Sequence, residues 1–235
     1  MNNNFIGFNE ETLNFFIDIK DNNNRTWFAE NKSRYEKYVK ETSLLFIEHI
    51  ACLFAEVGLP FVADTKKSLF RIYRDIRFSS NKNPYKTHLG IFFPYISSIL
   101  DRKPINSFGI YFHIEPEMYF LSAGIYQPEP SILKDIRERI SEDYPRFKDI
   151  LKSNNFSAIF PDGIDGEKLK KAPKGFDIDH PAIDYLKLKE FSAFLPLTKS
   201  EVTNSSISEY IIKVAIAILP LLEFLDGAIN KTNGQ

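Results

Sequence analysis

Cysteine is almost absent from this 235-residue chain, because Cys52 is the single one and no internal disulfide can form. A chain that has no disulfide fits a reducing compartment, so we expect a cytoplasmic protein. Cys52 lies in the apolar run IACLFAEVG. Such a context predicts an inert thiol packed in the core, since a reactive thiolate needs exposure and nearby positive charge.

Secretory features and long apolar runs are also missing. The first residues, MNNNFIGFNEE, contain neither the basic stretch nor the apolar stretch of a signal peptide. The longest apolar candidate, IIKVAIAILPLLEFL, contains Lys213, Pro220 and Glu223. It falls short of the roughly 20 uninterrupted apolar residues that span a bilayer, so we interpret it as a buried helix and expect no membrane partner.

The composition is that of a globular protein with a core rich in aromatic rings. Hydrophobic residues make up 43% of the chain, and 22 residues are Phe. The net charge of −1 gives no overall attraction for nucleic acid or for an anionic membrane. Because no internal repeat, low-complexity tract or Gly/Ser-rich linker interrupts it, we predict a single domain over residues 1–235.

The N-terminal part, residues of about 9–57, predicts helices. Asn9 is well placed to cap a helix that begins at Glu10. A second helical stretch runs from about residue 25 to residue 57, and Gly58 ends it. Tyrosines and charged residues alternate irregularly near its middle, which indicates a kink or a break.

The pattern then changes to period two over residues of about 69–126. Segments 70–74, 90–95, 108–114 and 118–126 predict strands, and the last two form an antiparallel hairpin. Residues of about 131–226 return to helical periodicity, with a loop over 161–181. Helices, then strands, then helices indicate an α+β protein with a mainly antiparallel sheet in the middle, flanked by N-terminal and C-terminal helices.

The most informative stretch is the basic segment, residues 69–88, with the sequence LFRIYRDIRFSSNKNPYKTH. It gathers many cations around one acid, Asp75, and interleaves them with aromatic residues. Guanidinium and ammonium groups bind carboxylates and phosphates. We therefore predict an anion-binding site made of Arg71, Arg74, Arg77, Lys82 and Lys86. The alternative is a solvated basic face whose cations form ion pairs with acids elsewhere in the chain.

On a regular strand, Arg74 would share the apolar face of Phe70, Ile72, Ile76 and Phe78. An unpaired guanidinium there would cost several kcal/mol. Two arrangements avoid this cost. Either Arg74 meets a buried acid, or the strand bulges near Arg74 and Asp75 and turns its side chains to new directions.

Candidates for proton transfer are Asp75, Tyr85 and His113. His113 precedes Glu115 by two residues on the same strand face, so the two side chains could both bind a metal. No third ligand stands at a diagnostic spacing, so we predict no metal site and interpret His113 as a hydrogen-bonded structural histidine. His88 directly follows the basic loop and could join it. The loop at residues 79–84 has no glycine, so it is not a Walker nucleotide loop.

The basic segment resembles the signature of DUF2461, a bacterial family of unknown function. The resemblance rests on the pattern Arg71-x-x-Arg74-Asp75-x-Arg77-Phe78 and on Asn81-Lys82-x-x-Tyr85-Lys86-Thr87. Three further segments, NNRTWF at 23–28, AGIYQP at 123–128 and LKKAPKGF at 169–176, are similar to other parts of that family. The resemblance implies a single-domain protein with no established activity, and it assigns no catalytic residue.

Three classes of function remain open. The first is an enzyme or a ligand-binding protein whose basic site takes a small phosphorylated or carboxylated molecule. The second is a nucleic-acid-binding module, which the low overall charge disfavours. The third is a structural or partner-binding protein whose arginines form internal ion pairs. The sequence identifies no cofactor.

Overall fold

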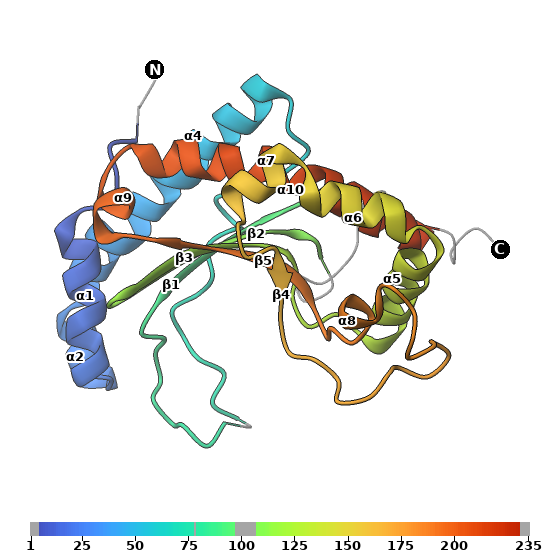
Figure 1. Ribbon diagram of the computed structural model, residues 1–235. Coiled ribbons are helices and arrows are strands. Elements are labelled where there is room, and N and C mark those ends of the chain that lie inside the picture. The colour runs from blue at the N-terminus through green and yellow to red at the C-terminus, as the bar shows by residue number, and fades with distance from the viewer. Residues whose placement is uncertain (1–4, 78, 97–106, 231–235) are drawn as a thin grey trace. The chain divides into compact units, whose positions relative to one another are not determined.

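The computed structural model describes residues 5–77, 79–96 and 107–230 (Figure 1). It confirms the predicted α+β class, because an antiparallel sheet lies in the middle of the chain between N-terminal and C-terminal helices. The N-terminal helical elements are α1 (Glu10–Asp21), α2 (Arg25–Glu30), α3 (Lys32–Arg34), the π-helical segment η1 (Tyr35–Glu41) and α4 (Thr42–Val57). The later helices are α5 (Pro130–Glu142), α6 (Tyr144–Lys152), α7 (Asn154–Ile159), α8 (Ile183–Leu186), α9 (Lys199–Thr203) and α10 (Ser206–Asn230). Within the described ranges, no helix combines the length and the apolarity needed to cross a bilayer.

The sheet has five strands: β1 (Leu89–Pro94), β2 (Gly109–Glu115), β3 (Met118–Ile125), β4 (Ile164–Asp165) and β5 (Phe191–Leu197). Their hydrogen-bonded order is β1-β2-β3-β5-β4. The hairpin of β2 and β3 is confirmed. The expectation that the sheet ends near residue 126 is wrong, because β5 and its short partner β4 belong to it. Both neighbours of β5 are remote in sequence, so no turn signal marks it.

The expectation that the sheet begins at residue 69 is also wrong. Residues 69–74 form isolated bridges, Leu69 with Ile91 and Tyr73 with Tyr85, instead of a strand of the sheet. The pairing is interrupted between the two bridges, and this interruption shapes the candidate site described below.

Contacts between backbone positions divide the chain into two compact units. The first contains Met1–Phe93, Tyr111–Leu121 and Pro196–Ile212. Its core is a cluster of phenylalanine rings. Phe46 of α4 lies 5.2 Å from Phe8 and 5.6 Å from Phe112 of β2, measured between ring centroids. Edge and tilted contacts of this kind stabilise a core beyond the area they bury.

The second unit contains Pro94–Ile110, Ser122–Leu195 and Lys213–Gln235. Its core also relies on rings, since Phe147 of α6 packs 5.6 Å from Phe224 of α10 and 5.1 Å from Tyr185 of α8. The guanidinium of Arg139 lies over the Phe224 ring at 4.9 Å. A single domain for the whole chain stays a prediction.

The N-terminal helices follow the sequence signals closely. Asn9 caps α1, because its side-chain oxygen accepts a hydrogen bond from the Thr12 N–H at 2.8 Å. The irregular middle of the second helical stretch is the π-helical segment η1. Cys52, however, is exposed on α4, so the expectation of a core thiol is wrong.

Gly124 of β3 marks a close approach of two backbones. Its φ is +140°, and a Cβ atom built there would lie 2.0 Å from the carbonyl oxygen of Phe191 in β5. We therefore expect Gly124→Ala to lower the free energy of unfolding by about 3 kcal/mol or more, because either the backbone or the strand pairing must shift.

The matched control is Gly227→Ala in α10, where a Cβ would meet nothing within 4 Å. This change should be neutral or should stabilise the protein by up to about 1 kcal/mol, since alanine favours helix. Urea denaturation measures both variants. Equal midpoints for the two would contradict the close approach at Gly124.

Candidate functional site

The basic segment forms an irregular hairpin. Its first arm is residues 69–77 and its second arm is residues 79–88, which lead into β1. Figure 1 shows the two arms side by side, extending away from β1. Backbone hydrogen bonds join the arms at Phe70 N–H to Gly90 (2.9 Å) and at Arg74 N–H to Pro84 (2.9 Å). Between them, the Lys86 N–H donates to Ile72 at 2.8 Å. The hairpin thus keeps an antiparallel pairing although it is not a regular ladder.

A bulge interrupts the second arm. Between the Phe70–Gly90 and Ile72–Lys86 bonds, one residue of the first arm, Arg71, faces residues 87–89 of the second. Extra residues of this kind bend a strand and turn side chains to new directions. The predicted bulge near Arg74 and Asp75 is therefore misplaced: the Arg74 N–H stays in the pairing, and the insertion includes His88 instead.

The predicted alternation of faces holds along the first arm. Arg71, Tyr73, Asp75 and Arg77 are exposed, whereas Ile72 is buried. Phe70, Arg74 and Ile76 are half-buried on the same face as Ile72. Phe78 lies outside the described residues. The hairpin therefore has one solvent-exposed face, termed the wet face, and one partly buried face. The cations of the hairpin are divided between these two faces.

The segment 23–28 anchors the second arm of this hairpin. The side-chain amide of Asn23 pairs with the backbone of Tyr85 in both directions, donating to its carbonyl at 3.0 Å and accepting from its N–H at 3.1 Å. The Tyr85 ring stacks on Phe28 with centroids 4.1 Å apart. Asn24 caps α2 by accepting from the Trp27 N–H at 2.9 Å. These contacts give a structural reason for the NNRTWF sequence.

Two of the five predicted ligand-binding cations donate side-chain hydrogen bonds within the hairpin. Arg77 forms a two-point ion pair with Asp75, with nitrogen–oxygen distances of 2.9 and 2.6 Å. This contact holds the pKa of the Asp75 carboxyl well below its usual range, through the Arg77 hydrogen bonds. The Lys82 ammonium donates to the Ile76 carbonyl at 3.0 Å. Both side chains contribute to the geometry of the hairpin tip.

The other three, Arg71, Arg74 and Lys86, form no ion pair with any acid of the described residues. Lys86 lies over the Phe70 ring, with its nitrogen 5.1 Å from the centroid. Burial lowers the pKa of Lys86, and the nearby charge of Arg71 lowers it further. Arg74 is half-buried. The predicted buried acid for Arg74 is therefore not found among the residues that the structure describes.

A polar cluster, defined here as His88, His113 and Glu115, lies next to these cations. One potential ligand atom of each residue lies within 4.8 Å of those of the other two. The rings of His88 and His113 stack with centroids 4.7 Å apart. The bulge therefore brings His88 to the histidine on β2, and Arg74 and Lys86 are near enough to act on His88 electrostatically.

Hydrogen bonds hold the polar cluster in place. The Tyr111 hydroxyl lies 3.0 Å from Nδ1 of His113, and Nε2 of His113 lies 3.3 Å from Oε2 of Glu115. The Thr87 hydroxyl donates to Oε1 of Glu115 at 3.0 Å. His113 is only 6% exposed, so the expectation of a hydrogen-bonded histidine agrees with this geometry.

The histidines of the cluster favour their neutral forms. Burial, together with the charges of His113 and Lys86, lowers the pKa of His88 to about 4. Burial also lowers the pKa of His113, and Glu115 opposes this effect. Neutral imidazoles accept hydrogen bonds or bind metals through a lone pair.

The three candidates for proton transfer are not brought together. Asp75 is engaged by Arg77 on the wet face. Tyr85 is 5% exposed, and burial raises its pKa, which disfavours the phenolate. His113 lies in the polar cluster on β2. These three residues are therefore poorly placed to act together as an acid–base pair. The arrangement instead favours binding of an anion by the cations of the hairpin.

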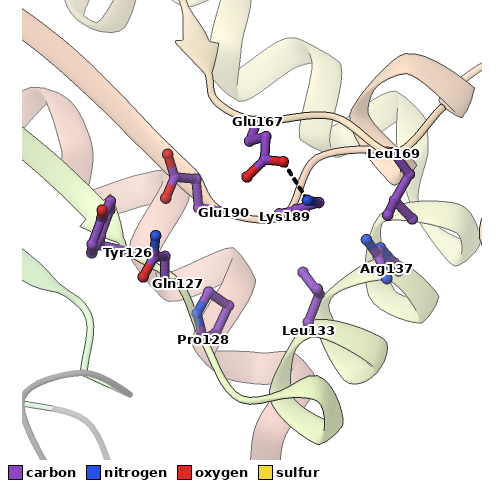
Figure 2. Close-up of a pocket in the computed structure, with 9 residues that line it drawn as sticks. All are labelled: Tyr126, Gln127, Pro128, Leu133, Arg137, Glu167, Leu169, Lys189 and Glu190. Carbon is purple, nitrogen blue, oxygen red and sulfur yellow. Dashed lines mark hydrogen bonds and ion pairs between the residues drawn. The ribbon is translucent and has the colours of Figure 1, made fainter. Parts of the chain in front are cut away.

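The second unit contains a cavity of about 560 Å³, drawn in Figure 2. Arg137 and Leu133 of α5 reach it, opposite Glu190. The Arg137 Nη2 donates to the Leu188 carbonyl at 2.8 Å, while its buried Nε has no partner in the described part of the chain. Sequence reasoning missed this cavity, although the family-like segments 123–128 and 169–176 both contribute residues to its wall.

We expect Asn23→Ala to loosen the hairpin, because it removes both hydrogen bonds to Tyr85. The free energy of unfolding should fall by about 1–3 kcal/mol. Amide hydrogen exchange should become faster at Arg74 and Lys86, whose N–H groups join the two arms. The matched control is Asn22→Ala, which removes an exposed side-chain amide that donates to the Asp18 carbonyl. Unchanged exchange in Asn23→Ala would contradict the anchoring role.

Comparison with known proteins supports the resemblance and adds no activity. A search of curated proteins and a search of solved structures each found no match. A family described as "Conserved hypothetical protein (DUF2461)" matches residues 11–224, which include the hairpin, the polar cluster and the residues that line the cavity. Since the match covers most of the sequence, this chain belongs to the DUF2461 family.

Proposed function

We propose that this protein binds a small phosphorylated or carboxylated molecule at Arg71, Arg74 and Lys86. The observation that carries the proposal is that these three cations share one hairpin and form no ion pair within the described residues. Although Arg71 lies on the wet face, its charge acts on Lys86, and the charges of Lys86 and Arg74 both act on His88, so the three cations are near neighbours. Repulsion between like charges weakens when an anion binds between them. Guanidinium groups supply two parallel donors to such an anion, and a lysine adds a point charge.

Partial burial strengthens this argument. Arg74 and Lys86 are half-buried, so part of their hydration is already lost before a ligand arrives. The Phe70 ring under the Lys86 ammonium provides a weakly favourable surface but no compensating negative charge. A phosphate or carboxylate would supply that charge. Arg77 and Lys82, by contrast, already have partners in the hairpin and become secondary candidates.

The proposal assigns binding and no reaction. The neutral His88 beside Arg74 and Lys86 could hydrogen-bond a ligand held by the cations. Proton transfer would require a substrate whose reacting atom reaches the polar cluster. A ligand-binding protein and an enzyme therefore share the same proposed site.

Nucleic-acid binding is less well supported by the aromatic residues. Single-stranded nucleic acids use exposed rings as stacking surfaces. Tyr73 is 52% exposed, but Tyr85 is buried against Phe28 and Phe70 lies under Lys86. Labelled oligonucleotides titrated at low salt would test this alternative, and saturable binding that weakens steeply with salt would favour it.

We also propose a cytoplasmic location. The single cysteine, Cys52, is exposed as a free thiol. An exposed thiol stays reduced in a compartment that maintains reducing conditions.

The binding test is isothermal titration calorimetry with phosphate, pyrophosphate and citrate as probes. We expect at least one of these anions to bind the wild-type protein. Arg71→Ala, Arg74→Ala and Lys86→Ala should each weaken that binding by about 10-fold or more, because each removes a charge-assisted hydrogen bond.

Two matched controls remove cations of the same hairpin. Arg77→Ala and Lys82→Ala should change the affinity by no more than about twofold, since both side chains already have partners and surface charges contribute little. The proposal would be wrong if none of the three anions bound, or if the two controls lost as much affinity as the other variants.

A further inference from the structure

We propose that His88, His113 and Glu115 form a binding site for a divalent transition-metal ion of the zinc type. The proposal does not depend on anion binding by the hairpin, because none of the cations Arg71, Arg74 and Lys86 is a metal ligand in it. Two imidazoles and one carboxylate are a common ligand set for zinc and for non-haem iron, with further positions left open for water or a substrate.

The separations in the polar cluster are close to those around one ion. The facing atoms of His113 and Glu115 are 3.3 Å apart, and all three ligand atoms lie within 4.8 Å of one another. Two ligands at about 2.0–2.2 Å from a tetrahedral zinc ion lie roughly 3.4 Å apart. His113 and Glu115 already have this spacing, and the ligand atom of His88, within 4.8 Å of theirs, would have to move closer to complete the set.

The remaining polar atoms of two ligands are held by neighbouring hydroxyl groups. Tyr111 contacts Nδ1 of His113, which leaves Nε2 facing Glu115. Thr87 donates to Oε1 of Glu115, which leaves Oε2 facing His113. Metal sites commonly use such outer contacts to fix the orientation of their ligands. These contacts leave Nε2 of His113 and Oε2 of Glu115, which face each other across a 3.3 Å hydrogen bond, as the atoms that would bind the ion.

The fold provides a rigid support. One face of β2 carries Tyr111, His113 and Glu115, because side chains two residues apart on a strand point to the same side. The Phe120 ring of β3 stacks on the His113 ring at 4.6 Å. His88 comes from the bulge that precedes β1. A buried histidine between an aromatic wall and a second histidine loses little conformational entropy on binding an ion.

The donor set also selects the type of metal. Magnesium and calcium prefer oxygen ligands, whereas imidazole nitrogen favours zinc, iron, nickel and copper. Two neutral imidazoles and one carboxylate leave a net charge of +1 on a divalent site. The nearby Arg74 and Lys86 oppose cation binding, so we expect a weaker affinity than in closed sites with four protein ligands.

The test is zinc binding to the full chain, measured by competition with a chromogenic chelator and by calorimetry. We expect one zinc ion per chain, with no comparable binding of magnesium. His88→Ala and Glu115→Gln should each weaken zinc binding by about 10-fold or more. Glu115→Gln keeps the oxygen that accepts from Thr87, so it tests the ligand atom while the outer contact stays in place.

The matched control is His49→Ala, since His49 is a half-buried histidine of α4 outside the polar cluster. The zinc affinity of His49→Ala should equal that of the wild type. Circular dichroism would verify that every variant is folded. No zinc binding by the wild type, or unchanged affinity in either ligand variant, would overturn the proposal and leave a purely structural hydrogen-bond network.

Discussion

The site depends on a mismatch in backbone pairing within the basic hairpin. One residue, Arg71, faces residues 87–89 between two backbone hydrogen bonds, so the second arm must bulge there. The bulge turns His88 to His113 on β2. It also keeps Lys86 over Phe70 and leaves Arg71 on the wet face. The bulge thus places a compact polar cluster beside cations that form no ion pair within the described part of the chain.

The segments that resemble the DUF2461 family have identifiable structural roles. Asn23 and Phe28 fasten the hairpin at Tyr85, one through backbone hydrogen bonds and the other through ring stacking. Gly124 allows β3 and β5 to approach closely. Residues of the segments 123–128 and 169–176 also contribute to the cavity of the second unit. The family pattern therefore describes scaffold contacts as well as the candidate site.

Local signals in the sequence predicted much of the fold. The Asn9 cap, the irregular helix near η1 and the hairpin of β2 and β3 all depend on neighbouring residues, and all are present. The alternation of exposure along the first arm of the hairpin was also predicted correctly. The strands β4 and β5 were missed because their pairing joins distant parts of the chain and leaves no turn signal between partners.

The candidate site was harder to predict for the same reason. A charge pattern identifies Arg71, Arg74 and Lys86, but only the folded chain shows that Arg77 and Lys82 have partners nearby. The spacing of His113 and Glu115 gave two possible metal ligands. The third, His88, is contributed by a bulge in a different segment, and no spacing rule identifies it.

The most direct measurement is a crystal structure of the protein soaked with tungstate, a heavy analogue of phosphate whose anomalous signal locates it without ambiguity. The account predicts tungstate within hydrogen-bonding distance of Arg71, Arg74 and Lys86. Tungstate found only at other sites, with these three side chains extended into solvent, would contradict it.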